Sequence, residues 1–208
     1  MQKLKLKVCG MREPENIVQV AAVQPDYMGF IFYKKSKRYV EDSMMIPPLA
    51  ESIQKVGVFV NAGYEEVITI VNRFGLKWIQ LHGEESPDYC RRIKGSGVKI
   101  IKAFPVDERF DFNETEDFQQ VADYFLFDTK GKLPGGNGVP FDWSLLDRYK
   151  GSIPFFLSGG ISRDNLSDVK NIRHPQFYGI DINSGVEDAP GMKSLKKINE
   201  LKHKLDSL

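Results

Sequence analysis

Two side chains that could do acid–base chemistry follow short apolar runs, one near the start of the sequence and one past its midpoint. Cys9 follows residues 4–8, and Asp128 follows residues 124–127, so each is expected at the end of a buried strand. A carboxyl group in such a place is either paired or has a raised pKa, which suits a general acid, although a cap on the following loop is the alternative. Cys9 is either a reactive thiol or a small buried residue. Lys7 shares its face of the strand, and a nearby lysine lowers a thiol pKa and favours the thiolate.

Two turns near the end of the sequence have the composition of an anion site. Residues 155–158 are an apolar run that ends at Gly159 and Gly160, and residues 179–185 repeat the pattern of a strand, a small polar turn and a final glycine. Glycines let backbone N–H groups approach a ligand closely. Adjacent strand-to-helix turns of this kind bind phosphate in (β/α)₈ barrels, so we predict a phosphate site at the C-terminal ends of strands 7 and 8.

Three further polar residues are candidates for a site at the strand ends. Gln80 and His82 end one predicted strand on the same face, and His82 is expected to be hydrogen-bonded. His174 and His203 fall in a loop and in the last helix, so the histidines predict no metal site at the strand ends. Arg38 lies in a basic run that is otherwise expected to be solvated, and its planar guanidinium is suited to binding a substrate carboxylate.

The elements that must position these residues alternate along the whole chain. Eight β-branched or aromatic runs are predicted to be strands, at residues 4–9, 27–32, 55–60, 78–82, 99–104, 124–128, 155–158 and 177–182. Helical patterns are predicted between and after them, at residues 13–23, within 43–54 (interrupted by Pro47 and Pro48), and at 64–74, 87–94, 114–121, 143–149, 164–170 and 194–205. This alternation predicts parallel βαβ units. We expect a single α/β domain over residues 1–208, a (β/α)₈ TIM barrel, with an open doubly wound sheet as the alternative, and Lys7 inside the barrel with Cys9.

One connection is much longer than the others. Residues 129–140 form a glycine-rich segment that leaves directly from Asp128. We interpret this segment as a lid over the site rather than a plain surface loop.

Composition excludes several classes of partner. The 208 residues carry a net charge of +1, which gives no field suited to a nucleic acid or an anionic membrane. There is no apolar run of the ~20 residues that a membrane span needs, and no signal sequence is recognised at the N-terminus. We expect a cytoplasmic protein in which Cys9 and Cys90 are thiols, with Cys90 packed in a helix.

Several of these segments together resemble the phosphoribosylanthranilate isomerase family. The resemblance runs in order over essentially the whole chain and includes nearly every strand end. The matching segments are residues 7–11 (KVCGM), 29–33 (GFIFY), 35–39 (KSKRY), 57–61 (GVFVN), 79–85 (IQLHGEE), 127–129 (FDT), 141–143 (FDW), 157–160 (LSGG) and 185–187 (GVE).

The resemblance implies an activity and roles for the two reactive side chains. The family rearranges N-(5-phosphoribosyl)anthranilate into 1-(2-carboxyphenylamino)-1-deoxyribulose 5-phosphate in tryptophan biosynthesis, without metal or organic cofactor. Its general acid corresponds to Asp128, which protonates the furanose ring oxygen. Its general base corresponds to Cys9, which removes the proton from C2′ of the ring-opened Schiff base.

The resemblance also implies how the phosphorylated substrate is bound. Arg38 corresponds to the group that binds the anthranilate carboxylate, and Gln80 and His82 line the pocket. Backbone amides in two segments correspond to the phosphate site, at Gly159, Gly160, Asp181, Asn183, Ser184 and Gly185. Asn183 is a departure, because many relatives have a second serine there. The alternatives are another phosphate-binding barrel similar to the histidine-pathway isomerase, or a barrel that binds sugar phosphates without catalysis, and the chain is expected to be a monomer or a homodimer.

Overall fold

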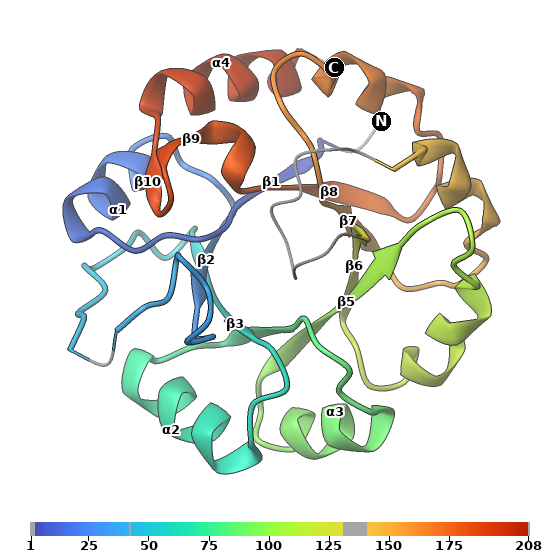
Figure 1. The fold of residues 1–208 in the computed structure, drawn as a ribbon, viewed down its shortest axis with the longest axis horizontal. Helices are drawn as coiled ribbons and strands as arrows, with labels where there is room; N and C mark the ends of the chain where they lie inside the picture. Colours follow the sequence, from blue (N-terminus) through green and yellow to red (C-terminus); the bar gives the residue numbers. More distant parts are fainter. Residues whose placement is uncertain (1–2, 42, 131–140, 208) are drawn as a thin grey trace.

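Eight parallel strands close into a barrel in the computed structural model of the chain, which describes residues 3–41, 43–130 and 141–207 (Figure 1). The strands are β1 (Lys5–Val8), β2 (Tyr27–Ile31), β3 (Gln54–Phe59), β4 (Trp78–Leu81), β5 (Lys99–Val106), β6 (Tyr124–Thr129), β7 (Phe155–Leu157) and β8 (Phe177–Ile182). Each pairs with the next, and β1 closes the ring by pairing with β8, with Leu6 opposite Ile180 and Val8 opposite Ile182. The predicted TIM barrel is therefore confirmed, and the open sheet is wrong.

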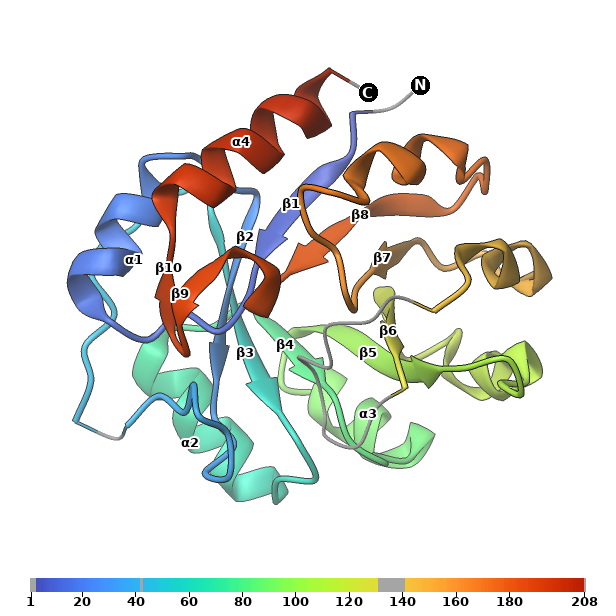
Figure 2. The same cartoon turned by 45° about the horizontal axis from the view of Figure 1, so that its top comes forward.

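Helices surround the barrel on the outside, as Figures 1 and 2 show. The α-helices are α1 (Pro14–Ala21), α2 (Tyr64–Phe74), α3 (Pro87–Lys94) and α4 (Leu195–Asp206). Their starts follow the sequence signals: α3 begins at Pro87 after Ser86, whose hydroxyl accepts a hydrogen bond from the Tyr89 N–H. Among the described residues, no helix is long and apolar enough to span a bilayer.

Of the predicted helices, one is absent and three are 3₁₀ rather than α-helices. The described residues 43–53 form no helix, because Pro47 and Pro48 lack the N–H groups that a helix needs. Three other segments are 3₁₀ rather than α-helical: η1 (Phe112–Phe118), η2 (Trp143–Arg148) and η3 (Leu166–Asn171). Each is only six or seven residues long, as is usual for 3₁₀ helices, which occur in short pieces.

A small hairpin after the last barrel strand was not predicted. Beyond β8 the chain forms a short 3₁₀ turn, η4 (Ser184–Val186), and then two antiparallel strands, β9 (Glu187–Ala189) and β10 (Met192–Lys193), before α4. The hairpin is fastened to α1, because Asn16 exchanges two hydrogen bonds with the backbone of Lys193, at 2.8 and 2.9 Å. The chain therefore does not pass directly from the eighth strand into a helix.

The barrel is plugged at the end where its strands begin. Buried and partly buried side chains from β2 to β8 meet there inside the ring and form a cluster that is separate from the layer between strands and helices. Its aromatic members pack mainly edge to face and are Tyr27, Trp78, Tyr124, Phe156 and Tyr178. Because this end is filled, a ligand can enter only from the C-terminal ends of the strands.

Replacing Phe156 by alanine is expected to reduce the free energy of unfolding by about 3–5 kcal/mol, the usual cost of a large cavity in a core. Phe156 is fully buried, and its ring contacts Tyr27 and Tyr178. Urea unfolding followed by circular dichroism measures the change. Val18, which is 55% exposed, is the control, because Val18→Ala should change stability by no more than about 0.5 kcal/mol. A loss below about 1 kcal/mol for Phe156→Ala would show that the plug is not tightly packed.

The predicted lid falls mainly on residues 131–140, which lie outside the described residues.

Candidate active site

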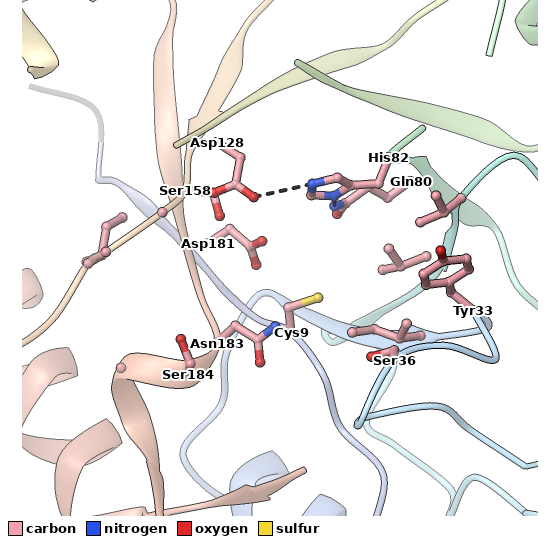
Figure 3. Close-up of a pocket in the computed structure, with 17 residues that line it drawn as sticks. Cys9, Tyr33, Ser36, Gln80, His82, Asp128, Ser158, Asp181, Asn183 and Ser184 are labelled. Atoms are coloured by element: carbon pink, nitrogen blue, oxygen red, sulfur yellow. Dashed lines mark hydrogen bonds and ion pairs between the residues drawn. The ribbon is translucent and has the colours of Figure 1, made fainter. Parts of the chain in front are cut away.

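The C-terminal ends of the strands form a pocket that collects most of the polar residues singled out in the sequence (Figure 3). Cys9 follows β1, Asp128 lies in β6, and the two segments rich in glycine follow β7 and β8. The predicted residues that line the pocket are Cys9, Gln80, His82, Asp128, Gly159, Gly160, Asp181, Asn183, Ser184 and Gly185. The acid and base candidates therefore face one cavity, although 118 positions separate them in the sequence.

The position of Cys9 is fixed by its neighbours on both sides. Its backbone N–H donates to the Ile182 carbonyl at 2.8 Å, which continues the pairing of β1 with β8. On the β2 side, a Cβ atom at Gly29 would lie only 2.7 Å from the Cys9 sulfur. The absence of a side chain at Gly29 therefore makes room for the thiol.

Lys7 lies inside the barrel beside Cys9, as predicted. Its side chain is fully buried, and its ammonium donates to Asp181 Oδ1 at 2.8 Å. Burial alone would lower the pKa of Lys7, but the Asp181 carboxylate, with a smaller effect from Cys9, outweighs burial and raises it. Lys7 is therefore a cation held within the pocket wall.

Lys7 lowers the pKa of the Cys9 thiol as predicted, but a larger effect opposes it. Burial raises the pKa of the Cys9 thiol, and this effect exceeds the opposing attraction of Lys7. Part of the Lys7 charge is neutralised by Asp181, whose negative charge also disfavours a thiolate. Cys9 is thus a protonated thiol in a site that already contains the cation needed to stabilise its ionised form.

Asp128 lies beside His82, which is in turn hydrogen-bonded to Gln80. His82 Nε2 lies 3.3 Å from Asp128 Oδ2, and His82 Nδ1 lies 2.7 Å from Gln80 Nε2 (Figure 3). Because an amide nitrogen can only donate, this orientation of Gln80 assigns Nδ1 as the acceptor and places the ring proton on Nε2, the nitrogen that lies near Asp128. Asp128 therefore has a polar neighbour, although it follows an apolar strand.

The glycine turn after β7 passes beside the other oxygen of Asp128. Gly159 and Gly160 have φ angles of +87° and +66°, which side chains rarely adopt. A Cβ atom at Gly159 would lie 2.7 Å from Asp128 Oδ1 and 2.5 Å from the Thr129 nitrogen. The bare backbone of this turn thus passes directly beside the carboxyl group.

The turns after β7 and β8 also touch each other at a glycine. A Cβ atom at Gly185 would lie 2.4 Å from the Ile161 carbonyl oxygen, so only glycine allows this approach. Ser162 N donates to Asn165 Oδ1 and Asn165 Nδ2 donates to the Gly160 carbonyl, at 2.9 and 2.8 Å, which fixes the first turn. The two turns form one continuous wall of the pocket.

Arg38 is the predicted residue whose side chain is engaged elsewhere. Its Nε and Nη2 donate to the two oxygens of Glu187 at 2.8 and 2.6 Å, and it is not among the residues that line the pocket. Its Cδ nevertheless approaches the same point as Asn183 Oδ1, since each would lie 2.6 Å from a Cβ atom at Gly10. The Arg38 side chain therefore runs along the edge of the pocket, and its role toward a substrate stays a prediction.

Sequence reasoning missed two charged residues beside the pocket. Glu187 and Lys193 lie on the unpredicted hairpin, and their side chains form an ion pair of 2.7 Å. Glu187 stands in the segment GVE, which contributes to the family resemblance, so it could have been noticed. Lys193 has no such signal, because it is one of 29 basic residues in a stretch with no recognisable pattern.

A closed eight-stranded α/β barrel with a polar pocket and glycine-rich segments at the C-terminal ends of its strands is the architecture of a TIM-barrel enzyme. Sequence comparison identifies which one. The profile of the family described as N-(5′phosphoribosyl)anthranilate (PRA) isomerase matches residues 6–204. An N-(5′-phosphoribosyl)anthranilate isomerase of Parabacteroides distasonis is 48% identical over 197 residues, which cover 93% of this chain and 89% of the relative.

Solved structures agree with this result. The phosphoribosyl anthranilate isomerase of Thermus thermophilus has a TM-score of 0.84 at 29% identity, with 98% of this chain and 99% of that chain covered. A phosphoribosyl anthranilate isomerase in complex with reduced 1-(o-carboxyphenylamino)-1-deoxyribulose 5-phosphate has a TM-score of 0.80 at 29% identity, with 99% and 100% covered.

The chain therefore belongs to the phosphoribosylanthranilate isomerase family. Its activity is the conversion of N-(5-phosphoribosyl)anthranilate into 1-(2-carboxyphenylamino)-1-deoxyribulose 5-phosphate in tryptophan biosynthesis.

Proposed function

We propose that this pocket performs the isomerisation with Asp128 as general acid and Cys9 as general base. The observation that carries the proposal is that both side chains face one cavity whose other end is closed by the aromatic plug. The ribose of the substrate would lie between them. Each well-placed acid or base contributes about 10²–10⁴-fold to the rate.

The first step assigned to Asp128 is opening of the furanose ring. The protonated carboxyl group donates its proton to the ring oxygen, the bond from C1′ to that oxygen breaks, and the nitrogen lone pair forms the C=N bond of a protonated Schiff base. His82, oriented by Gln80, lies against the Asp128 carboxyl group with its Nε2 at 3.3 Å. The oxygen beside Gly159 is free to face the substrate.

The second step is assigned to Cys9. Its thiolate takes the proton from C2′, the released electron pair forms the C1′=C2′ bond, and the Schiff-base nitrogen regains its lone pair to give an enolamine. Protonation of C1′ and loss of the 2′-hydroxyl proton then give the ketone. This step requires the thiolate of Cys9, whose burial is costly. The buried ammonium of Lys7 favours the thiolate and offsets part of that cost.

Substrate binding is assigned to the remaining groups. The backbone amides of Gly159, Gly160 and residues 181–185 would bind the phosphate, since the two turns form one wall without bulky side chains. Arg38 would bind the anthranilate carboxylate with its Nη1, because Nε and Nη2 are already bonded to Glu187. These assignments make the substrate span the pocket from the turns after β7 and β8 to the edge beside β1.

The test of the activity is direct. The purified chain is mixed with phosphoribosylanthranilate made enzymatically in place, and loss of substrate fluorescence is followed with time. Enzyme-dependent loss, with formation of the deoxyribulose phosphate product, supports the proposal. Turnover of only the histidine-pathway substrate, or tight binding without turnover, would favour one of the two alternatives.

The oligomeric state is a separate proposal. The phosphoribosylanthranilate isomerase of Thermotoga maritima is described as dimeric, in a structure of monomers generated from it. We propose that this chain is a monomer or a homodimer, and light scattering coupled to gel filtration distinguishes a mass near 24 kDa from one twice as large.

Replacing Gly185 by alanine is expected to raise the KM for phosphoribosylanthranilate at least about ten-fold. The added methyl group would lie 2.4 Å from the Ile161 carbonyl oxygen, so the two proposed phosphate-binding turns must separate. Such a separation weakens several amide contacts to the phosphate together. Steady-state kinetics and competitive inhibition by inorganic phosphate both measure the effect.

Gly63→Ala is the matched control, because no atom lies within 4 Å of a Cβ atom at that position. Its KM should stay within two-fold of wild type. If Gly185→Ala also leaves KM and phosphate inhibition unchanged, the phosphate is not bound at this wall of the pocket.

A further inference from the structure

Lys193 on β10 is a buried charge for which the mechanism above has no use. Its side chain is 0% exposed, and its ammonium donates three hydrogen bonds: to Asn183 Oδ1 at 2.7 Å, to the Asn183 carbonyl at 3.2 Å and to Glu187 Oε1 at 2.7 Å. An ammonium has three donors, so all of them are used. Burying a charge is costly without such pairing, and here each donor of the ammonium has a partner that fixes its position.

The backbone at Lys193 is held from the opposite side. The Asn16 side chain on α1 accepts from Lys193 N at 2.8 Å and donates to Lys193 O at 2.9 Å. Both residues are almost fully buried. Lys193 is therefore a fixed point between α1 and the turn that follows β8.

The first group that Lys193 holds is the Asn183 side chain. Because Lys193 donates to Oδ1, the carboxamide is fixed with its NH₂ group on the other side. Asn183 lines the pocket next to Cys9, as expected from the pairing of β1 with β8 (Figure 3). A carboxamide can rotate, so it needs a partner of this kind to present one face to a ligand.

The second group that Lys193 holds is Glu187, and through it Arg38. Glu187 Oε1 accepts from Lys193, from Arg38 Nε at 2.8 Å and from Gly191 N at 3.1 Å, and Oε2 accepts from Arg38 Nη2. Burial would raise the pKa of Glu187, but the hydrogen bond from Arg38 and the charge of Lys193 lower it. Glu187 therefore stays ionised and fixes the plane of the Arg38 guanidinium.

We propose that Lys193 is a positioning residue for substrate binding, which fixes Asn183 directly and Arg38 through Glu187. The two segments that would contact opposite ends of the substrate are then kept at a constant spacing by one buried ammonium. This inference rests on the proposed function, in which Arg38 binds the carboxylate and residues 181–185 bind the phosphate.

The network predicts a pH dependence of binding in the wild-type enzyme. Burial lowers the pKa of Lys193 to about 8, against the attraction of Glu187 and Cys9 and with a further lowering by Arg38. Above pH 8 the ammonium loses its proton and one of its three donors, so KM rises. Glu187 and Arg38 keep their charges in this range, and the substrate phosphate is already doubly ionised. Cys9 affects the catalytic step, so its titration is seen in kcat.

The experiment measures KM and kcat for phosphoribosylanthranilate between pH 7 and pH 9.5 in the full chain. Lys193→Met removes the charge and keeps the length, Lys193→Arg keeps the charge, and Lys197→Met is the matched control. Lys197 also contacts this hairpin, at the Glu187 carbonyl and Asp188, but it is exposed and does not reach Asn183. We expect KM to rise at least about ten-fold in Lys193→Met at pH 7, with kcat within three-fold of wild type. This is the pattern expected when a mutation weakens binding of the substrate and of the transition state equally. Lys193→Arg should recover most of the affinity.

Two results would overturn the proposal. One is a KM for folded Lys193→Met within two-fold of the Lys197→Met value. The other, which needs no variant and therefore decides even if Lys193→Met does not fold, is a wild-type KM that stays constant from pH 7 to pH 9.5. Failure of the proposed function is distinct, because the wild-type chain would then show no turnover of phosphoribosylanthranilate at any pH.

Discussion

Replacing Asp128 by asparagine is expected to lower kcat by about 10²–10⁴-fold, the usual contribution of a general acid. Asparagine keeps the shape of the side chain, and its oxygen can keep the contact with His82 Nε2. Only the proton that opens the furanose ring is lost. The change therefore separates chemistry from binding, and the dissociation constant of reduced 1-(o-carboxyphenylamino)-1-deoxyribulose 5-phosphate should stay within a few-fold of wild type.

Asp123→Asn is the matched control for this change. Asp123 lies at the other end of the same strand, where it accepts a hydrogen bond from Ile100 N at 2.8 Å, and an amide oxygen can do the same. Its kcat should be close to wild type. Asp128 is not the general acid if Asp128→Asn retains more than about a tenth of the wild-type kcat.

The barrel itself could be predicted because each strand carries a local signal. Buried parallel strands are continuous apolar runs, as in residues 124–127, and such runs are recognisable one at a time. The helices were harder, because length and proline decide between α, 3₁₀ and no helix. The segment with Pro47 and Pro48 shows this, since its amphipathic pattern is outweighed by two missing N–H groups.

The position of the pocket followed from topology rather than from any single motif. In a parallel barrel all strands end at the same face, so Cys9 and Asp128 must meet there once both are placed at strand ends. Lys7 was placed inside the barrel by alternation along β1, and its full burial confirms that step. Topology therefore predicts where each side chain lies, whereas its chemical role depends on the groups around it.

The state of Cys9 and the partners of Arg38 could not be predicted for that reason. A lysine two residues away favours a thiolate, but the sequence does not show that Asp181 shares the lysine or how deeply the thiol is buried. In the same way, Arg38 meets Glu187, which is 149 positions away on a hairpin without a sequence signal. Both cases depend on contacts between distant segments, which only the folded chain reveals.

Replacing Cys9 by serine is the second change with a large expected effect, again a loss in kcat of about 10²–10⁴-fold. A hydroxyl has a far higher pKa than a thiol, so it is a much poorer base at neutral pH. The pH profile makes the result specific. Burial raises the pKa of Cys9, so below that pKa the thiolate fraction, and with it the wild-type kcat, should rise with pH, up to ten-fold per unit. In Cys9→Ser this rise should disappear.

Because kcat is measured at saturating substrate, it does not include the proposed effect of Lys193 on substrate binding. Any pH dependence that comes from Asp128 is the same in wild type and in Cys9→Ser. Cys90→Ser is the control, because Cys90 is also a buried thiol, with a pKa raised to about 11, but lies in α3 outside the pocket. Cys90→Ser should keep both the wild-type kcat and its rise with pH. If Cys9→Ser shows the same rising profile as wild type, the proton at C2′ is removed by a different group. Asp181, a carboxylate that lines the pocket and pairs with Lys7, is then the residue to replace next.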